Sequence, residues 1–129
     1  MERKLIDPAD IVAMNVPNYS HGCRTEGARV RLVLSGQIGL APDGSLREGI
    51  EAQCAQALAN IDACLREAGM GKENLVMLRI FLVRQEDLGA LRAARGAWLG
   101  DVRTPSTLLF ISGLVNPALL VEIEAEAAA

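Results

Sequence analysis

The chain has 129 residues, of which 50% are hydrophobic and only 3% aromatic, and its formal net charge at pH 7 is −3. A chain of this length is expected to form a single domain, residues 1–129, with a core of aliphatic side chains. The acidic balance argues against a nucleic-acid partner, because binding to phosphates requires a basic face, and no apolar run is long enough for a membrane span.

The cysteines, the histidine and the N-terminus restrict the chemistry and the compartment. Cys23, Cys54 and Cys64 form no metal-ligand spacing and are odd in number, so neither a zinc site nor a disulfide framework is predicted. A Ser-His-Asp triad would depend entirely on His21, the only histidine. The N-terminus, MERKLIDPAD, is charged and lacks the apolar segment of a signal peptide. Together these features predict a reduced, cytoplasmic protein.

Residues 29–38 are the first stretch with a clear strand pattern, after an N-terminal region with room for one or two short strands. In this stretch, RVRLVLSGQI, apolar side chains alternate with others and β-branched residues are frequent, which is typical of a strand. The sequence APDGS follows, and its Pro42 and Asp43-Gly44 predict a turn.

The period then changes to that of a helix over residues 49–69. Leu58, Ile61 and Leu65 fall on one helical face, and Gly69 is well placed to end the helix. Burial of each of these three side chains contributes about 1.5–3 kcal/mol, so the face is expected to pack on a sheet.

Residues 73–83, ENLVMLRIFLV, are apolar on both faces, which predicts a central strand. Residues 85–100 return to helical spacing, with Asp87 as a candidate N-cap. One face of this second helix carries Leu88, Leu91, Arg95 and Trp98.

Residues 104–127 read as two apolar strands joined by a turn, a hairpin-like ending. Two helices can cover only one face of the resulting sheet, and the second face still carries Met77 and Phe81. Self-association through that second face is therefore expected.

Several stretches, in this order, carry a resemblance to a known family: Pro17-Asn18-Tyr19-Ser20, LVLSGQIGLAPDGSL, EAQCAQALANIDACLREAG, RIFLVRQEDL, and the segment from Pro105 through LLVEIEAEA. Over most of its length the chain resembles the reactive intermediate deaminase family (RidA/YjgF), known under an older label as endoribonuclease L-PSP. The resemblance implies a chorismate-mutase-like (bacillus-type) α+β domain, in which two helices pack on one face of a mixed β-sheet. It also implies a homotrimer with a ligand cleft at each subunit interface.

The resemblance further implies a site that hydrolyses small enamines or imines. The family's water-positioning glutamate falls on Glu122, its tyrosine on Tyr19, and a backbone group near Leu109 would polarise the substrate. The arginine that holds the substrate carboxylate in the family is replaced by Thr107, and Arg92 stands where an asparagine is expected. No cofactor or metal is implied, because water attack on a C=N bond needs only positioning and proton transfer.

The loss of that arginine implies a departure from the family's usual substrate binding. A bidentate arginine–carboxylate contact contains two charge-assisted hydrogen bonds, each contributing about 1.5–3 kcal/mol, and threonine supplies neither the charge nor the reach. Arg92, Arg79 and Arg103 are the candidate replacements.

Alternatives remain open at the level of sequence. Glu122 could belong to a solvated acidic strand edge with Glu124 and Glu126, Thr107 could be an ordinary strand threonine, and Tyr19 could cap local backbone. The protein could equally bind or sense a small molecule without chemistry. Ribonuclease activity rests only on the older family label, because the chain lacks a basic, aromatic-rich face.

Overall fold

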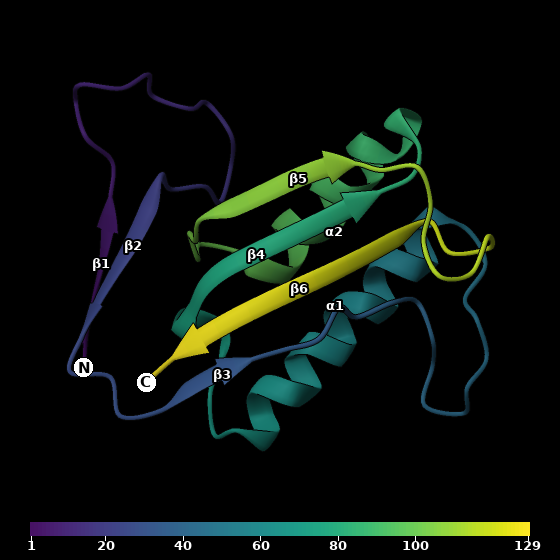
Figure 1. Cartoon of the computed structure of the whole chain (residues 1–129), viewed down its shortest axis with the longest axis horizontal. Coiled ribbons are helices and arrows are strands. Elements are labelled where there is room, and N and C mark those ends of the chain that lie inside the picture. Colours follow the sequence, from purple (N-terminus) through teal and green to yellow (C-terminus); the bar gives the residue numbers. More distant parts are fainter.

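The computed structural model describes residues 1–129. Its elements are, in chain order, β1 (Glu2–Ile6), β2 (Gly22–Glu26), β3 (Arg31–Val33), α1 (Ile50–Glu67), η1 (Lys72–Asn74), β4 (Leu75–Leu82), η2 (Gln85–Asp87), α2 (Leu88–Leu99), β5 (Ser106–Phe110) and β6 (Val121–Ala128) (Figure 1). Both predicted helices and the predicted central strand are confirmed. Neither helix combines the length and the apolar character that crossing a membrane requires.

The main sheet has four strands in the order β3-β6-β4-β5. Strand β6 is antiparallel to both of its neighbours, whereas β4 and β5 are parallel and are joined by α2. Parallel neighbours require such a crossover, so the helical segment between them dictates their direction. The sheet is therefore mixed, as predicted.

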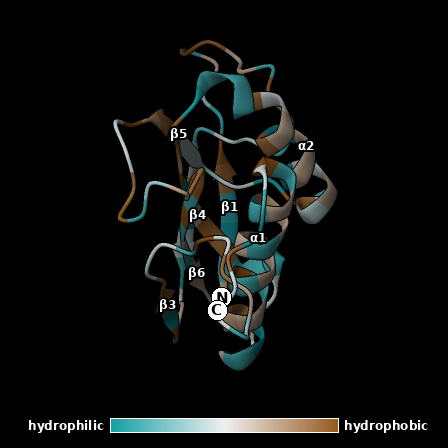
Figure 2. Ribbon diagram, turned by 90° about the vertical axis from the view of Figure 1, so that its right-hand side faces the viewer, coloured by the Kyte–Doolittle hydropathy of each residue, from teal (hydrophilic) through white to brown (hydrophobic).

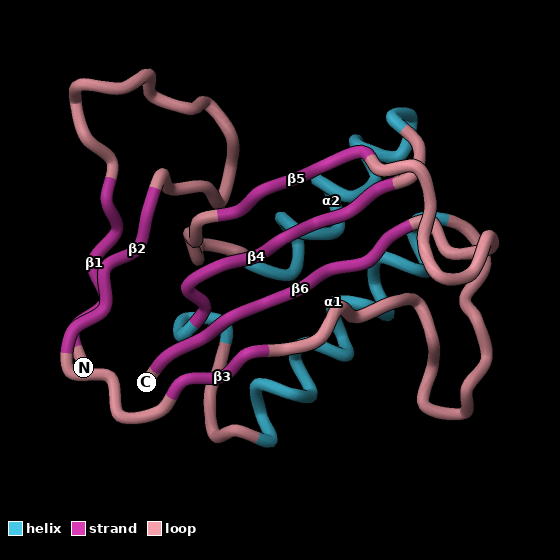
Figure 3. The backbone as a smooth tube through the Cα atoms, viewed as in Figure 1, coloured by secondary structure: helices cyan, strands magenta, loops and turns pink.

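The prediction of a hairpin-like ending is wrong. Strands β5 and β6 follow each other in the sequence, but β4 lies between them in the sheet (Figure 1). The loop that joins them, residues 111–120, crosses the end of β4, and Figure 3 shows it as a long connection. Local patterns identify each strand, whereas the pairing partner depends on contacts between residues distant in the sequence.

The strand predicted over residues 29–38 is regular only at Arg31–Val33. Beyond it, the chain continues beside β6 through separate hydrogen bonds, from the amide of Leu34 to the carbonyl of Ala125 (3.0 Å) and from the amide of Gln37 to the carbonyl of Ile123 (2.7 Å). The N-terminal strands β1 and β2 form a second, two-stranded sheet beside the main one (Figure 1).

Both helices pack on the same face of the main sheet, which is seen edge-on in Figure 2. The core between the two layers is aliphatic, because alternate residues of β4 and β6 point into it. Its fully buried members include Ile61, Leu65, Leu75, Leu78, Leu82, Leu91, Val121 and Ile123. The opposite face of the sheet has no helix over it, and we call it the open face.

A buried glutamine on α1 ties two loops to the helix. The side-chain amide of Gln53, which is 2% exposed, donates to the carbonyl oxygens of Arg47 (3.1 Å) and Ala118 (3.0 Å). Its carbonyl oxygen accepts a hydrogen bond from the amide of Leu120 (2.8 Å). One side chain therefore fixes the start of α1 relative to the loop that enters β6.

Replacing Gln53 with leucine is expected to lower the free energy of unfolding by roughly 2–4 kcal/mol, because it removes three part-buried hydrogen bonds to the backbone of the two loops. Urea unfolding would measure the change. The control is Gln56→Leu on the same helix, since the amide of Gln56 bonds only to the side chains of Asn60 and Arg47. Equal midpoints for both variants would contradict this role of Gln53.

Asp87 is the N-cap residue of α2, as predicted, but its side chain does not cap the helix. Its carboxylate makes no hydrogen bond to the helix. It accepts two from Arg84 instead, at Nε and Nη2, both at 2.8 Å. This bidentate ion pair closes the turn between β4 and α2, and it outcompetes a cap because both of its partners are charged.

Candidate functional site

The open face carries side chains from three strands that stand in register. Each pair of directly opposite residues shares a face, so the strand pairings define rows across β5, β4 and β6. One row is Leu109, Phe81 and Glu122, and the next is Thr107, Arg79 and Glu124. Three of the predicted site residues, Glu122, Thr107 and Leu109, thus lie on the open face, and Arg79 lies directly beside Thr107.

Glu122 is the unpaired carboxylate of this face. Glu124 lies 3.6 Å from Nη1 of Arg79, and Glu126 accepts a hydrogen bond from Nη2 of the same arginine at 2.8 Å. The side chain of Glu122 forms neither an ion pair nor a hydrogen bond, and the residue is half-buried. Gly36 lies against its carboxylate, because a β-carbon at position 36 would lie 2.3 Å from Oε2 of Glu122. A glycine is therefore what leaves room for Glu122 beside the backbone.

The guanidinium of Arg79 forms ion pairs with Glu124 and Glu126. Hydrogen bonds from Arg31 and Arg79 to Glu126 hold the pKa of that carboxyl below its ordinary value. Arg79 therefore occupies the place next to Thr107 without being a free cation. Binding of an anionic ligand there would have to displace Glu124 or Glu126.

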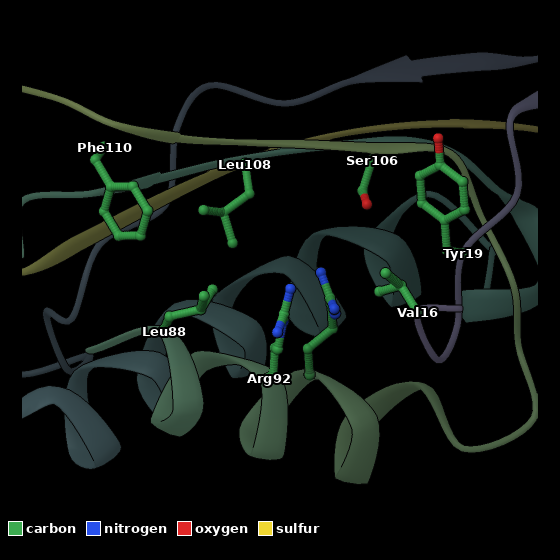
Figure 4. Close-up of a pocket in the computed structure, with 8 residues that line it drawn as sticks. Val16, Tyr19, Leu88, Arg92, Ser106, Leu108 and Phe110 are labelled. Carbon is green, nitrogen blue, oxygen red and sulfur yellow. The ribbon is translucent and has the colours of Figure 1, made fainter. Parts of the chain in front are cut away.

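Tyr19 and Arg92, the other two predicted site residues, lie on the opposite side of β5. They line a pocket of about 290 Å³ between α2 and β5 (Figure 4). Alternation along β5 explains the division, since its even-numbered residues face the pocket and its odd-numbered ones the open face. The lining consists of Val16, Tyr19, Leu88, Arg92, Arg95, Ser106, Leu108 and Phe110. Within one chain, the five predicted residues thus form two separate groups.

Arg95 is the pocket residue that the sequence analysis assigned only to a helix face. It is 6% exposed and makes no ion pair, and its buried Nε has no hydrogen-bond partner. Burial, and then the positive charge of Arg92, lower the pKa of the Arg95 guanidinium below its ordinary value. The signal in the sequence was an arginine at a position whose helical spacing calls for an apolar side chain, in line with Leu88 and Leu91.

Tyr19 and Arg103 belong to a polar network that holds the loop between β1 and β2. The Tyr19 hydroxyl lies 3.2 Å from Nδ1 of His21. Arg103 donates from Nε to the carbonyl oxygen of Tyr19 (2.9 Å) and from Nη2 to the carboxylate of Asp7 (2.9 Å). Arg103 is therefore engaged in structure and does not project into the pocket beside Arg92.

The cysteines lack the environment of a nucleophile. Cys54 belongs to the buried face of α1, and burial raises the pKa of its thiol to about 11. Cys23 and Cys64 are half-buried and unpaired. Since the thiolate is the reactive form, Cys54 behaves as a small apolar core residue.

The fold and the open face define a class of small α+β subunits, in which two helices cover one side of a mixed sheet with the chorismate-mutase-like arrangement. The model of the endoribonuclease L-PSP family matches residues 11–129. The chain belongs to this family, which is the RidA/YjgF family that its sequence resembles.

Relatives and solved structures agree with that assignment. The chain is 32% identical to the RutC family protein slr0709 of Synechocystis over 127 residues, covering 96% of this chain and 95% of that protein. A Rid family protein of unknown function, YyfB from Yersinia pestis, superimposes with a TM-score of 0.87 at 28% identity over 100% of both chains. RidA from an Antarctic Psychrobacter species gives a TM-score of 0.74 at 26% identity, covering 95% of this chain and 98% of that one.

Proposed function

We propose that the protein hydrolyses a small imine, enamine or related C–N substrate on the open face, with Glu122 as the catalytic residue, in a homotrimer. The observation that carries the proposal is that the carboxylate of Glu122 has no cationic partner. It is the one glutamate of β6 without an arginine partner, and it lies half-buried against Gly36 beside Phe81. A carboxylate that is not neutralised by a cation is able to accept a proton from water.

The chemistry follows from that proton transfer. Glu122 takes a proton from a water molecule, whose oxygen adds to the carbon of the C=N bond, and the nitrogen gains a proton. The resulting carbinolamine then loses ammonia and becomes a carbonyl compound, so imine and water are converted to carbonyl and ammonia. Orientation of the water and proton transfer supply the rate enhancement.

Backbone groups at the edge of the sheet are suited to polarise the substrate. Strand β5 pairs only with β4, through the carbonyl of Pro105 and the amide of Ile111 among others. Alternate residues of a paired strand direct their backbone groups to opposite sides, so those of Leu109 face β4 and those of Leu108 and Phe110 face outward. The polarising group near Leu109 is therefore assigned to Leu108 or Phe110.

Thr107 and Arg79 favour a substrate that is not held by an arginine–carboxylate pair. Thr107 carries no charge, and the charge of Arg79 is already shared between Glu124 and Glu126. The hydroxyl of Thr107 and the apolar side chains of Leu109 and Phe81 suit a small substrate of low charge.

Exposed apolar side chains on the open face support assembly into a homotrimer. Leu109 is 48% exposed and Val33 is 60% exposed in the isolated chain, and both belong to the open face. A second copy would cover these apolar side chains and would shield Glu122 from bulk water. Sedimentation analysis is expected to show a trimer, and a monomer at all concentrations would contradict this part of the proposal.

The test is ammonia release from freshly generated imines. The panel contains 2-iminopropionate and an uncharged imine of similar size, with an arginine-containing family member as the positive control. Release above the uncatalysed rate, with the uncharged imine preferred over 2-iminopropionate, is the expected result. No release from a folded trimer with any member of the panel would overturn the proposal.

A second candidate function is small-molecule binding without turnover. It is favoured by the absence of a free cation beside Thr107, because the usual carboxylate contact is missing. Saturable binding of an imine or of its carbonyl product, without ammonia release, would establish this function instead.

A further inference from the structure

We propose that the groove between α1 and α2 binds a second copy of this chain, with the two α1 helices antiparallel across a two-fold axis near Ala59. The two helices lie side by side on the side of the sheet away from the open face (Figure 2). This contact is therefore separate from the proposed assembly through the open face. The groove has a volume of about 440 Å³, and its lining consists of Ala55, Leu58, Ala59, Asp62, Ala94, Ala97 and Trp98.

The composition of this groove differs from that of a helix surface in contact with water. The solvent side of a helix normally carries charged and polar side chains. Here six of the seven lining residues are apolar, and Asp62 is the charged one. Ala55, Ala59 and Ala97 are nevertheless exposed in the isolated chain. A hollowed apolar surface with a charged residue beside it is typical of a protein–protein contact.

Small side chains give the groove the shape that a helix requires. Packed helices lie about 8–10 Å apart between their axes, and the distance depends on the side chains at the contact. The alanines of both helices keep this surface low, so another helix can approach between α1 and α2. The half-buried indole of Trp98 forms part of the wall, and tryptophan is frequent among residues that dominate binding energy.

Two charged residues of α1 determine which helix fits the groove. Glu51 and Arg66 share the groove-facing side of α1, because positions 51, 55, 59, 62 and 66 follow helical spacing. Glu51 precedes Ala59 by eight residues and Arg66 follows it by seven, so both lie roughly 11 Å from Ala59 along the helix axis. An antiparallel copy of α1 centred on Ala59 therefore brings Glu51 beside Arg66 of the second copy, and the reverse.

Both charges are available for such a contact. Glu51 is exposed and has no ion-pair partner in the isolated chain. Arg66 pairs with Asp62 at 2.7 Å, but its side chain is 67% exposed, and a guanidinium has five N–H donors. It can bind Asp62 and Glu51 of the second copy together. Because the pattern is complementary to itself, it favours a second copy in an isologous contact over an unrelated helix.

The experiment is sedimentation velocity of the full chain over a concentration series, with Ala59→Glu as the test variant. The wild type is expected to double the unit that the open face forms, from trimer to hexamer or from monomer to dimer. In Ala59→Glu, a carboxylate meets its own copy at the two-fold axis, and the doubling is expected to weaken at least about 10-fold. The doubling is measured relative to the smaller unit, so failure of the homotrimer and failure of this contact are distinguishable.

The matched control is Ala63→Glu, which adds the same charge at an exposed position of α1 that does not line the groove. This variant is expected to associate as the wild type does. Circular dichroism would verify that both variants fold. Equal association of Ala59→Glu and Ala63→Glu, or a wild type that never doubles, would overturn the proposal.

Charge reversal tests whether the occupant is a second copy. Glu51→Arg and Arg66→Glu each place like charges opposite one another, and each is expected to weaken the doubling about 3- to 10-fold. The double variant exchanges the two charges and is expected to restore the association of the wild type. A double variant that associates no better than the weaker single variant would contradict the antiparallel contact.

Discussion

Replacing Glu122 with glutamine is expected to lower the rate of ammonia release roughly 100-fold or more while leaving the thermal midpoint unchanged. Glutamine has the same size and shape but cannot accept a proton from water. Because Glu122 makes no ion pair, the substitution removes no structural contact. The rate would be measured with the best substrate of the imine panel, and the fold by circular dichroism and sedimentation.

The matched control for Glu122→Gln is Glu124→Gln, two residues along the same face of β6. Glu124 lies 3.6 Å from Arg79, a long contact on a partly exposed pair, so its loss should change the rate only a few-fold. Comparable loss in both variants would indicate a general effect of charge on the open face. Full activity in Glu122→Gln would remove Glu122 from the mechanism.

Replacing Arg95 with methionine is expected to stabilise the protein by about 1–4 kcal/mol, because it exchanges a buried, unpaired guanidinium for an apolar side chain of similar length. For a domain of this size, the gain corresponds to several degrees in Tm. Thermal unfolding followed by circular dichroism would measure the difference in Tm between the variant and the wild type.

The control for Arg95→Met is Arg95→Lys, which keeps a buried charge and is expected to be no more stable than the wild type. A lower Tm for Arg95→Met in the absence of ligand would contradict the reading of Arg95 as an unpaired charge.

Much of the fold could be predicted because its signals are local. The apolar run over β4 and the helical face of Leu58, Ile61 and Leu65 depend only on neighbouring residues, and the structure confirms both. The hairpin at the end of the chain was predicted wrongly, because strand pairing is a long-range property. Asp87 does occupy the predicted N-cap position, but its carboxylate binds Arg84 on the preceding turn instead of the helix backbone.

The candidate site could be predicted only in part. The family resemblance pointed to Glu122, Thr107, Leu109, Tyr19 and Arg92, and their roles remain predictions. The sequence did not predict that Tyr19 and Arg92 lie on one side of β5 and the other three residues on the opposite side. That division depends on how separate elements pack together.

By itself, the sequence determined the type of each element, the apolar face of each helix and the family, because periodicity and motifs are properties of adjacent residues. Only the tertiary structure decided that β4 separates β5 from β6, which places Arg79 beside Thr107 and leaves Glu122 unpaired. It also decided that Arg95 shares a pocket with Arg92. The physical reason is that charge pairing and burial depend on which distant segments pack together.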